Sequence, residues 1–267
     1  SKLAIDWYRS RFKKVLRELE NNYSKYRISD ALMSTYKLIW DDYCSWFLEM
    51  VKPPFGEAID QKTYDAVISI LEDNLKILHP FVPFVSEEIW QNIKKRSKEE
   101  ALIVASWPEF ADFDASLIDG FAMASEVISG IRSVRTTKNI SYKDSIRLQV
   151  LNNENTSKDF DPIIKKLGNV SELTYVDEQV KGALSFRVKS NDYFIPVAGA
   201  IDVEAEKAKL EEELNYNRGF LKSVEKKLSN ERFVNNAPAK VVEVEQQKKQ
   251  DAEAKIEAIE ASLKALS

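Results

Sequence analysis

The stretch NERFVNNAPAKVVEVE (residues 230–245) lies where one long, charged helical pattern ends and a second begins. Asn235, Asn236 and Pro238 interrupt the first pattern, and a proline in the first turn suits the start of the second helix. Before this stretch, seam residues recur at alternating steps of four and three: Leu210, Leu214, Asn217, Leu221, Val224 and Leu228. After it, the same spacing is kept by Ala252, Ile256, Ile259, Leu263 and Leu266. Two such seams of similar length predict an antiparallel coiled-coil hairpin.

A helix pair of this kind is too thin to form a globular core, so we expect it to project as an arm. At 1.5 Å per residue each helix would be roughly 45 Å long. Asn217, an amide on an otherwise apolar seam, predicts that one register is favoured at some cost in stability.

Charge along the predicted arm is uneven. Residues 202–213 hold six acidic residues and two lysines, whereas residues 216–240 hold six basic residues and two acidic ones. A basic region toward the tip is typical of a surface that meets a polyanion. The alternative is that these charges are simply the solvated faces of a coiled coil, and the charges alone favour this alternative.

The preceding residues predict two further parts. Apolar residues at helical spacing predict helices over about 3–22, 29–51, 60–78, 86–90 and 114–136, the second capped by Ser29 and Asp30. From residue 140 the pattern changes to short strands at 146–151, 171–176, 184–189 and 193–197, with a helix over 160–167 and a turn at Asn191–Asp192. The predicted fold is therefore mainly α: an antiparallel helical bundle (1–139), a small α/β module (140–201) and the coiled-coil hairpin (202–267).

The composition excludes several kinds of site. One cysteine, Cys44, and one histidine, His79, exclude a disulfide framework and the usual protein zinc sites. Seven glycines leave little room for a glycine-rich phosphate loop, and no apolar run reaches the roughly 18 residues of a membrane span. We expect a cytoplasmic chain without a catalytic constellation, and its first residues, already in helical rhythm, suggest a fragment of a longer protein.

Helical spacing in the aromatic-rich segment 36–47 predicts packing rather than a cofactor site, with Cys44 as a small buried hydrophobe. Basic residues gather in two places outside the hairpin. Arg9 and Arg11 lie beside Trp7, and Arg132, Arg135 and Lys138 step by three along one helix end. Basic and aromatic side chains together can hold phosphates and stack bases. The alternatives are that Trp7 is a core residue and that the second group complements the helix dipole.

Five segments carry motifs in a recognisable order: ALMSTYKLIWDDYCSWFLEMVKP (31–53), LKILHPFVPFVSEEIWQ (75–91), SWP (106–108), IPVAGAIDVEAEKAKLEEEL (195–214) and KLSNERFVNNAPAKVVEVE (227–245). Their order and spacing resemble the C-terminal third of bacterial-type valyl-tRNA synthetases, over nearly the whole chain. The first segments are shared with other class I synthetases, whereas the last two look specific to the valine family.

The resemblance implies a bundle of the class I anticodon-binding type that binds the anticodon stem-loop of valine tRNA. It implies a hairpin that reaches the outer corner of the tRNA, where the D and T loops meet. ATP would be used by a catalytic domain outside this chain, so the chain alone is expected to be an inactive monomer without a cofactor. The family's first bundle helix would precede Ser1, so part of the anticodon site is expected to be missing.

Three groups of residues are the candidate tRNA contacts. Trp7, Arg9 and Arg11 are expected near the anticodon stem, and Arg132, Arg135 and Lys138 on the phosphate backbone. The hairpin face at the tRNA corner is expected to be lined by Arg218, Lys222, Lys248 and Lys249. The competing hypothesis is a structural coiled-coil adaptor that binds a protein partner through an apolar stripe outside the seams.

Overall fold

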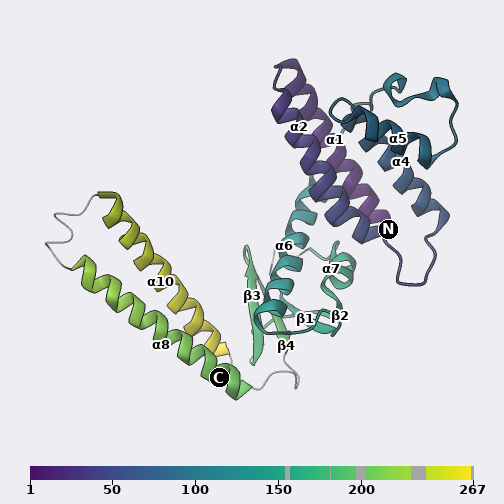
Figure 1. Cartoon of the computed structure of the whole chain (residues 1–267). Coiled ribbons are helices and arrows are strands. Elements are labelled where there is room, and N and C mark those ends of the chain that lie inside the picture. The colour runs from purple at the N-terminus through teal and green to yellow at the C-terminus, as the bar shows by residue number, and fades with distance from the viewer. Residues whose placement is uncertain (154–156, 181, 197–202, 230–238, 266–267) are drawn as a thin grey trace. The chain divides into compact units, whose positions relative to one another are not determined.

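The structure, a computed structural model, describes residues 1–153, 157–180, 182–196, 203–229 and 239–265 (Figure 1). The chain forms two compact units. The first comprises residues 1–129 and 157–168, and the second comprises residues 130–156 and 169–267. The chain therefore passes between the units three times. The domain limits expected from the sequence stay a prediction.

The first unit is helical. Its elements are α1 (Lys2–Ser24), α2 (Ile28–Lys37), η1 (Leu38–Phe47), α3 (Leu48–Val51), α4 (Gln61–Leu78), α5 (Pro83–Ile93), the short turns η2 (Lys98–Glu100) and η3 (Leu102–Val104), the first part of α6 (Ala115–Thr137), and α7 (Asp161–Gly168). Together with the small sheet of the second unit, this confirms the predicted fold class. None of the described helices combines the length and apolar composition needed to cross a membrane.

The ends of the predicted helices are set by local capping. The carboxylate of Asp60 accepts a hydrogen bond from the backbone N–H of Thr63 at 2.9 Å, so α4 begins at the predicted residue. The cap expected at Ser29 and Asp30 is wrong, because α2 already begins at Ile28. His79 ends α4, as its position before a proline predicts.

The middle of the predicted helix 29–51 departs from α-helical geometry. Its ten-residue segment η1 is a π-helix with an i→i+5 pattern, and it buries Leu38, Tyr43 and Phe47. Tyr36, in the preceding α2, and Trp40, in η1, are both exposed, Trp40 to 59%, and their rings stack with centroids 6.2 Å apart. The packing predicted for these two residues is wrong. Cys44, expected to be buried, is also exposed.

Aromatic side chains form much of the core of the first unit. Trp7 packs against Phe121 with ring centroids 4.1 Å apart, and Tyr8 against Phe47 at 4.9 Å. The hydroxyl of Tyr8 donates to the side-chain oxygen of Asn74 at 2.8 Å, and burial raises the pKa of Tyr8 well above its ordinary value. A buried hydroxyl with a partner fixes the orientation of α1 against α4 as well as filling space.

Helix α7 packs with the first unit although the strands on either side of it in the chain belong to the second. The ammonium of Lys166 donates to the backbone oxygens of Met50 (2.8 Å) and Lys52 (2.6 Å), which end α3. The ring of Phe160, just before α7, lies 5.9 Å from that of Phe121. The helix predicted over 160–167 is thus confirmed, and the hydrogen-bond partners of Lys166 lie more than one hundred residues away in the chain.

The second unit contains a four-stranded sheet of order β2-β1-β4-β3. Its strands are β1 (Ile146–Leu151), β2 (Val170–Val176), β3 (Ala183–Val188) and β4 (Asn191–Pro196). β1 and β2 are parallel, and β4 is antiparallel to both β1 and β3. The turn predicted at Asn191–Asp192 is wrong: Asn191 pairs with Val188, and Lys189, with φ of 52°, makes the turn.

Helices α8 (Val203–Leu228) and α10 (Ala239–Ala265) lie side by side (Figure 1). Cross-helix ion pairs join Arg218 to Glu260 and Lys249 to Glu225, which shows that the two helices run antiparallel. The predicted seam is buried at Leu210, Leu214, Asn217, Val224, Ala252 and Ile259. The amide of Asn217 donates to the backbone oxygen of Glu213 in its own helix, at 2.8 Å. The predicted turn at 235–238 and the side chains of Asp202, Glu204, Glu206, Arg232 and Lys240 lie outside the described residues.

Candidate nucleic-acid interface

Arg9 is the candidate contact in the first unit that the structure places at a cavity. The cavity has a volume of about 410 Å³ and lies between α1, α4 and the loop around residue 107. The aromatic part of its lining is Tyr8, Phe12 and Trp107, with Pro108 beside them. Its charged residues are Arg9, Lys13, Asp73, Lys76 and Glu109. The lining therefore mixes aromatic and charged side chains, and of the three aromatic residues only Trp107 is exposed.

Trp107 is a functional candidate that the sequence analysis missed. Its side chain is 39% exposed, and its ring meets Tyr23 edge-on with centroids 6.2 Å apart. One signal was present: the SWP motif places a tryptophan before a proline, outside any helical pattern, where core packing is not expected.

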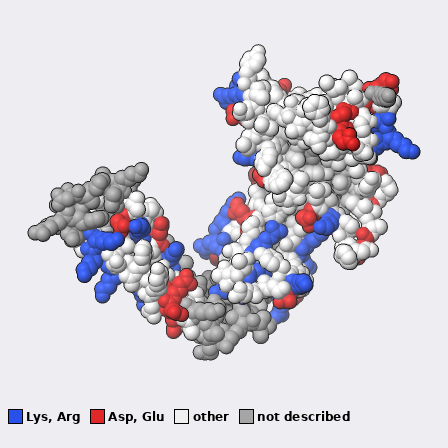
Figure 2. All heavy atoms as spheres, viewed as in Figure 1, with Lys and Arg blue, Asp and Glu red and all other residues white. Residues whose placement is uncertain are grey.

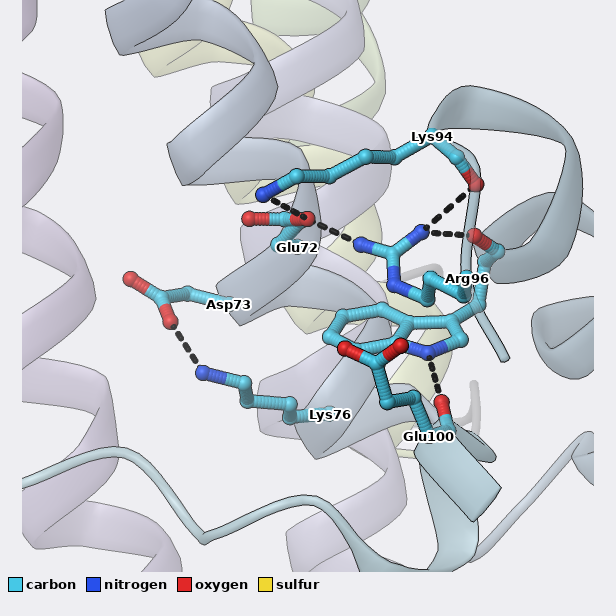
Figure 3. Close-up of polar contacts among 7 residues, drawn as sticks. Glu72, Asp73, Lys76, Lys94, Arg96 and Glu100 are labelled. Carbon is cyan, nitrogen blue, oxygen red and sulfur yellow. Dashed lines mark hydrogen bonds and ion pairs between the residues drawn. The ribbon is translucent and has the colours of Figure 1, made fainter. Parts of the chain in front are cut away.

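A clamp around Arg96 fastens the segment that leads to Trp107 (Figure 3). The guanidinium of Arg96 lies 3.8 Å from the ring centroid of Trp90 and donates to the backbone oxygen of Trp90 and to Glu72. The indole of Trp90 in turn donates to the backbone oxygen of Glu100 at 2.9 Å. Helices α4 and α5 are thereby tied to the loop, which limits the positions that Trp107 can take.

The three cations of the cavity differ in their contacts. Lys76 pairs with Asp73 at 3.0 Å (Figure 3), and Lys13 donates to the backbone oxygen of Asp112 at 3.2 Å. Arg9 is exposed and makes no hydrogen bond or ion pair with any described residue. Its guanidinium is therefore available to an anion at the cavity mouth without first breaking an internal contact.

The structure does not support contacts with nucleic acid for the two other candidates on α1. Trp7 is 2% exposed in the aromatic core, so its ring cannot stack on a base. The Nε of Arg11 lies 2.8 Å from Asp42, and both side chains are largely covered. Burial raises the pKa of the Asp42 carboxyl, and the guanidinium of Arg11 opposes that rise. Arg11 therefore neutralises a covered carboxylate on η1.

Arg132, Arg135 and Lys138 do not form one basic face. Arg135 is 1% exposed, and its guanidinium donates to the backbone oxygens of Ser141 (2.7 Å) and Asn169 (3.1 Å). Burial lowers the pKa of Arg135. A side chain enclosed in this way is held for the fold and is not presented to a phosphate. Arg132 is exposed and Lys138 is partly buried.

Three of the four candidate cations on the arm have carboxylate partners. Arg218 pairs with Glu260 at 2.6 Å, Lys248 with Glu245 at 2.7 Å and Lys249 with Glu225 at 3.2 Å. The hydrogen bond to Glu225 raises the pKa of Lys249, and that from Lys248 lowers the pKa of Glu245. The Arg218 and Lys249 pairs are solvent-exposed, so a phosphate could replace the carboxylate at little cost, whereas Glu245, the partner of Lys248, is largely covered.

Lys222 is the fourth cation, and among the described residues it has no ion-pair partner. Figure 2 shows basic and acidic side chains interspersed along the described part of the arm. On the described part of the arm, internal pairing therefore leaves individual accessible cations such as Lys222.

A shallow cavity of about 280 Å³ lies between the two helices of the arm. Lys248 and Lys255 line it together with Tyr216 and Phe220, and Tyr216 is 74% exposed. The two aromatic residues are four apart on α8, outside the seam, and the sequence analysis did not single them out. Exposed rings beside lysines are the combination that stacks bases and holds phosphates.

Two family models match the chain. Residues 6–150 match the family model described as the anticodon-binding domain of tRNA ligase. Residues 202–267 match the model described as the valyl tRNA synthetase tRNA binding arm.

Curated relatives are similar along the whole chain. The chain is 69% identical, over its full length, to a valine–tRNA ligase of Christiangramia forsetii, and 45% identical to one of Parabacteroides distasonis. It is 33% identical to a valine–tRNA ligase of Enterococcus faecalis, a match that includes 96% of the chain. The chain spans 30% of the length of each of these relatives.

Proposed function

The chain belongs to the anticodon-binding domain family of tRNA ligases and carries a tRNA binding arm of the valyl-tRNA synthetase type, and from this premise we propose how it binds its RNA. The helical bundle binds the anticodon stem-loop of valine tRNA, and the arm contacts the outer corner of the same molecule. The chain acts in the cytoplasm as a monomer. In the whole protein it positions valine tRNA for ATP-dependent aminoacylation, and ATP is used outside the present 267 residues.

One observation carries this proposal: a match to an anticodon-binding domain and a match to a tRNA binding arm occur in a single chain. The geometry adds accessible cations and rings in both regions. Arg9 and Trp107 lie together in the bundle, and Lys222 and Tyr216 are exposed on the arm. Structured RNA is recognised largely by shape and backbone contacts, which suits exposed cations and rings in each region.

The adaptor alternative requires a long apolar stripe on the arm outside its seams. On the described part of the arm, the large apolar side chains that are exposed are Tyr216, Phe220 and Val244. Two of these are aromatic residues beside lysines, and the third stands alone, so no stripe of useful length is present on that part. RNA binding accounts for the arm better.

Binding of valine tRNA to the full chain, measured by fluorescence anisotropy at rising salt, tests the proposal. Affinity should fall linearly on a log–log plot, with a slope of about −0.7 to −0.9 per phosphate contact. Valine tRNA should bind more tightly than a tRNA for another amino acid. The proposal is contradicted if the chain binds neither tRNA at low salt. It is also contradicted if light scattering shows oligomers and the chain has no measurable affinity for RNA.

A further inference from the structure

The segment that joins α6 to β1 in the second unit concentrates positive charge that contacts in the bundle and the arm do not explain. Residues 130–150 hold five basic residues and one acidic residue, in a chain whose net charge is −4. Arg135 is buried, whereas Lys143 and Arg147 are exposed and make no hydrogen bond or ion pair with any described residue. Figure 2 shows basic side chains over α6 and the sheet. Lys143 and Arg147 are therefore open to an anion without first breaking an internal contact.

The loop before β1, residues 140–145, is held by hydrogen bonds of its own backbone. The side-chain amide of Asn169 donates to the backbone oxygens of Tyr142 (2.9 Å) and Asp144 (3.3 Å). The backbone N–H of Asp144 donates to the backbone oxygen of Ser141 at 3.1 Å. The side chains of the loop from Ser141 onward are exposed. A loop that is fixed before binding loses little conformational entropy when it meets a partner.

Nearby carboxylates do not cancel the charge of the two cations. Asp144 is the acidic residue within this segment, and its charge acts on Arg135: burial lowers the pKa of Arg135, and Asp144 opposes that fall. Glu172 lies on β2 in register with Arg147, but the structure places no ion pair between them. The positive charge of Lys143 and Arg147 is therefore lessened by its surroundings and not neutralised.

The surroundings of these cations fit a phosphate backbone better than a protein. The segment also carries exposed hydroxyl groups, at Ser133, Thr136, Ser141 and Ser145. Arginine, lysine and hydroxyl side chains supply most contacts to phosphate oxygens in nucleic-acid complexes. Among the described residues from 130 to 196, Tyr142 is the one large hydrophobic side chain that is exposed, and its hydroxyl lies 3.3 Å from that of Thr136. A protein interface would need a larger apolar centre, so a nucleic acid is the better match.

We propose that Lys143 and Arg147 form a further contact site of the chain, which holds the phosphate backbone of the bound RNA. This inference rests on the proposed function, because it adds a contact to the same complex. Phosphate contacts fix the position of a nucleic acid and carry no sequence information directly. The site therefore adds affinity equally for valine tRNA and for other tRNAs of the same shape, and discrimination between them lies elsewhere in the chain.

The test combines Lys143→Gln with Arg147→Gln in the full chain and uses whole valine tRNA as the probe. Affinity should fall about tenfold at low salt, and the salt slope should lose about two phosphate contacts. Affinity for a tRNA of another amino acid should fall by the same factor. Hydroxyl-radical footprinting should show one short stretch of the tRNA backbone that loses protection while the rest of the footprint is kept. The melting temperature should not change, because neither side chain has a partner among the described residues.

Lys189→Gln is the matched control. It removes an exposed cation from the turn between β3 and β4, which lies at the opposite end of the sheet from Arg147 because β4 runs antiparallel to β1. Affinity, salt slope and footprint should stay as in the wild type. Unchanged affinity and footprint in the double variant, or an equal loss of affinity in Lys189→Gln, would overturn the inference while tRNA binding stands. If the unmodified chain binds no tRNA at low salt, the proposed function and the inference fail together.

Discussion

Arg135→Met tests whether this arginine stabilises the fold or binds RNA. The methionine retains most of the apolar stem but removes two charged hydrogen bonds, to the backbone oxygens of Ser141 and Asn169. Each carbonyl keeps one backbone donor, from Asp144 and from Ile146 respectively. The cost therefore lies at the lower end for charged hydrogen bonds, and we expect a loss of about 2–3 kcal/mol in the free energy of unfolding.

Hydrogen exchange measures this loss where it occurs. Backbone amides of residues 140–150 and 169–176 should exchange about 30- to 150-fold faster in Arg135→Met, since about 1.4 kcal/mol corresponds to a factor of ten. All five tryptophans lie at or before residue 107, so their emission reports the first unit and should change less on urea titration. The affinity of the folded variant for valine tRNA should stay the same.

Arg132→Gln is the matched control, three residues earlier on α6 and exposed. It should leave amide exchange unchanged and weaken tRNA binding modestly. The reasoning fails if Arg135→Met keeps its exchange protection and loses affinity for tRNA, because Arg135 would then be a phosphate ligand.

Three further predictions concern the second unit. Gly130→Ala should lower stability by about 1–3 kcal/mol, because a Cβ at this position would lie 2.5 Å from the ring of Phe186; Gly130→Ala with Phe186→Leu should recover part of the loss in a urea titration. The hydrogen bond from Lys248 lowers the pKa of Glu245, because it favours the ionised carboxylate. The stability that the ionised Glu245 gives to the arm is therefore present above the ordinary carboxyl pKa and is lost as pH falls through the lowered pKa. Melting followed by circular dichroism should show this pH dependence in the wild type and less of it in Glu245→Gln. Lys222→Glu should weaken binding of valine tRNA severalfold with no change in melting temperature, since no described residue pairs with Lys222; a matching fall in melting temperature would show a structural role.

The seam of the arm could be predicted because its cause is local. Leu210, Leu214 and Ile259 are buried together as their spacing requires, since helical periodicity alone determines which residues share a face. The same reasoning failed for Trp40 and Cys44. A π-helix changes the number of residues per turn, and the apolar pattern does not encode that change in backbone hydrogen bonding.

The candidate site was predicted less well because its causes are distant in sequence. Arg135 looked like its exposed neighbour Arg132, and it is buried because carbonyls at 141 and 169 meet its guanidinium. The position of Trp107 depends on a loop that is held by the contacts between Arg96 and Trp90. Residue type suggested which side chains could bind RNA, but exposure and partners, which depend on tertiary structure, decided which of them remain candidates.

The assignment of α7 to the first unit has a consequence for dissecting this protein. Residues 157–168, which lie between β1 and β2 in the chain, belong to the first unit, so each unit is made of two separate segments. A truncation after residue 139 would remove Lys166, together with its hydrogen bonds to the backbone oxygens at the end of α3. Transfer of the sheet into another scaffold would carry α7 with it, and the apolar face of α7 would then lack the first-unit residues that it packs against. A cut after residue 168 would keep α7 with the bundle but would remove β1 from between β2 and β4, so exchange between homologues should succeed only when both units are exchanged together.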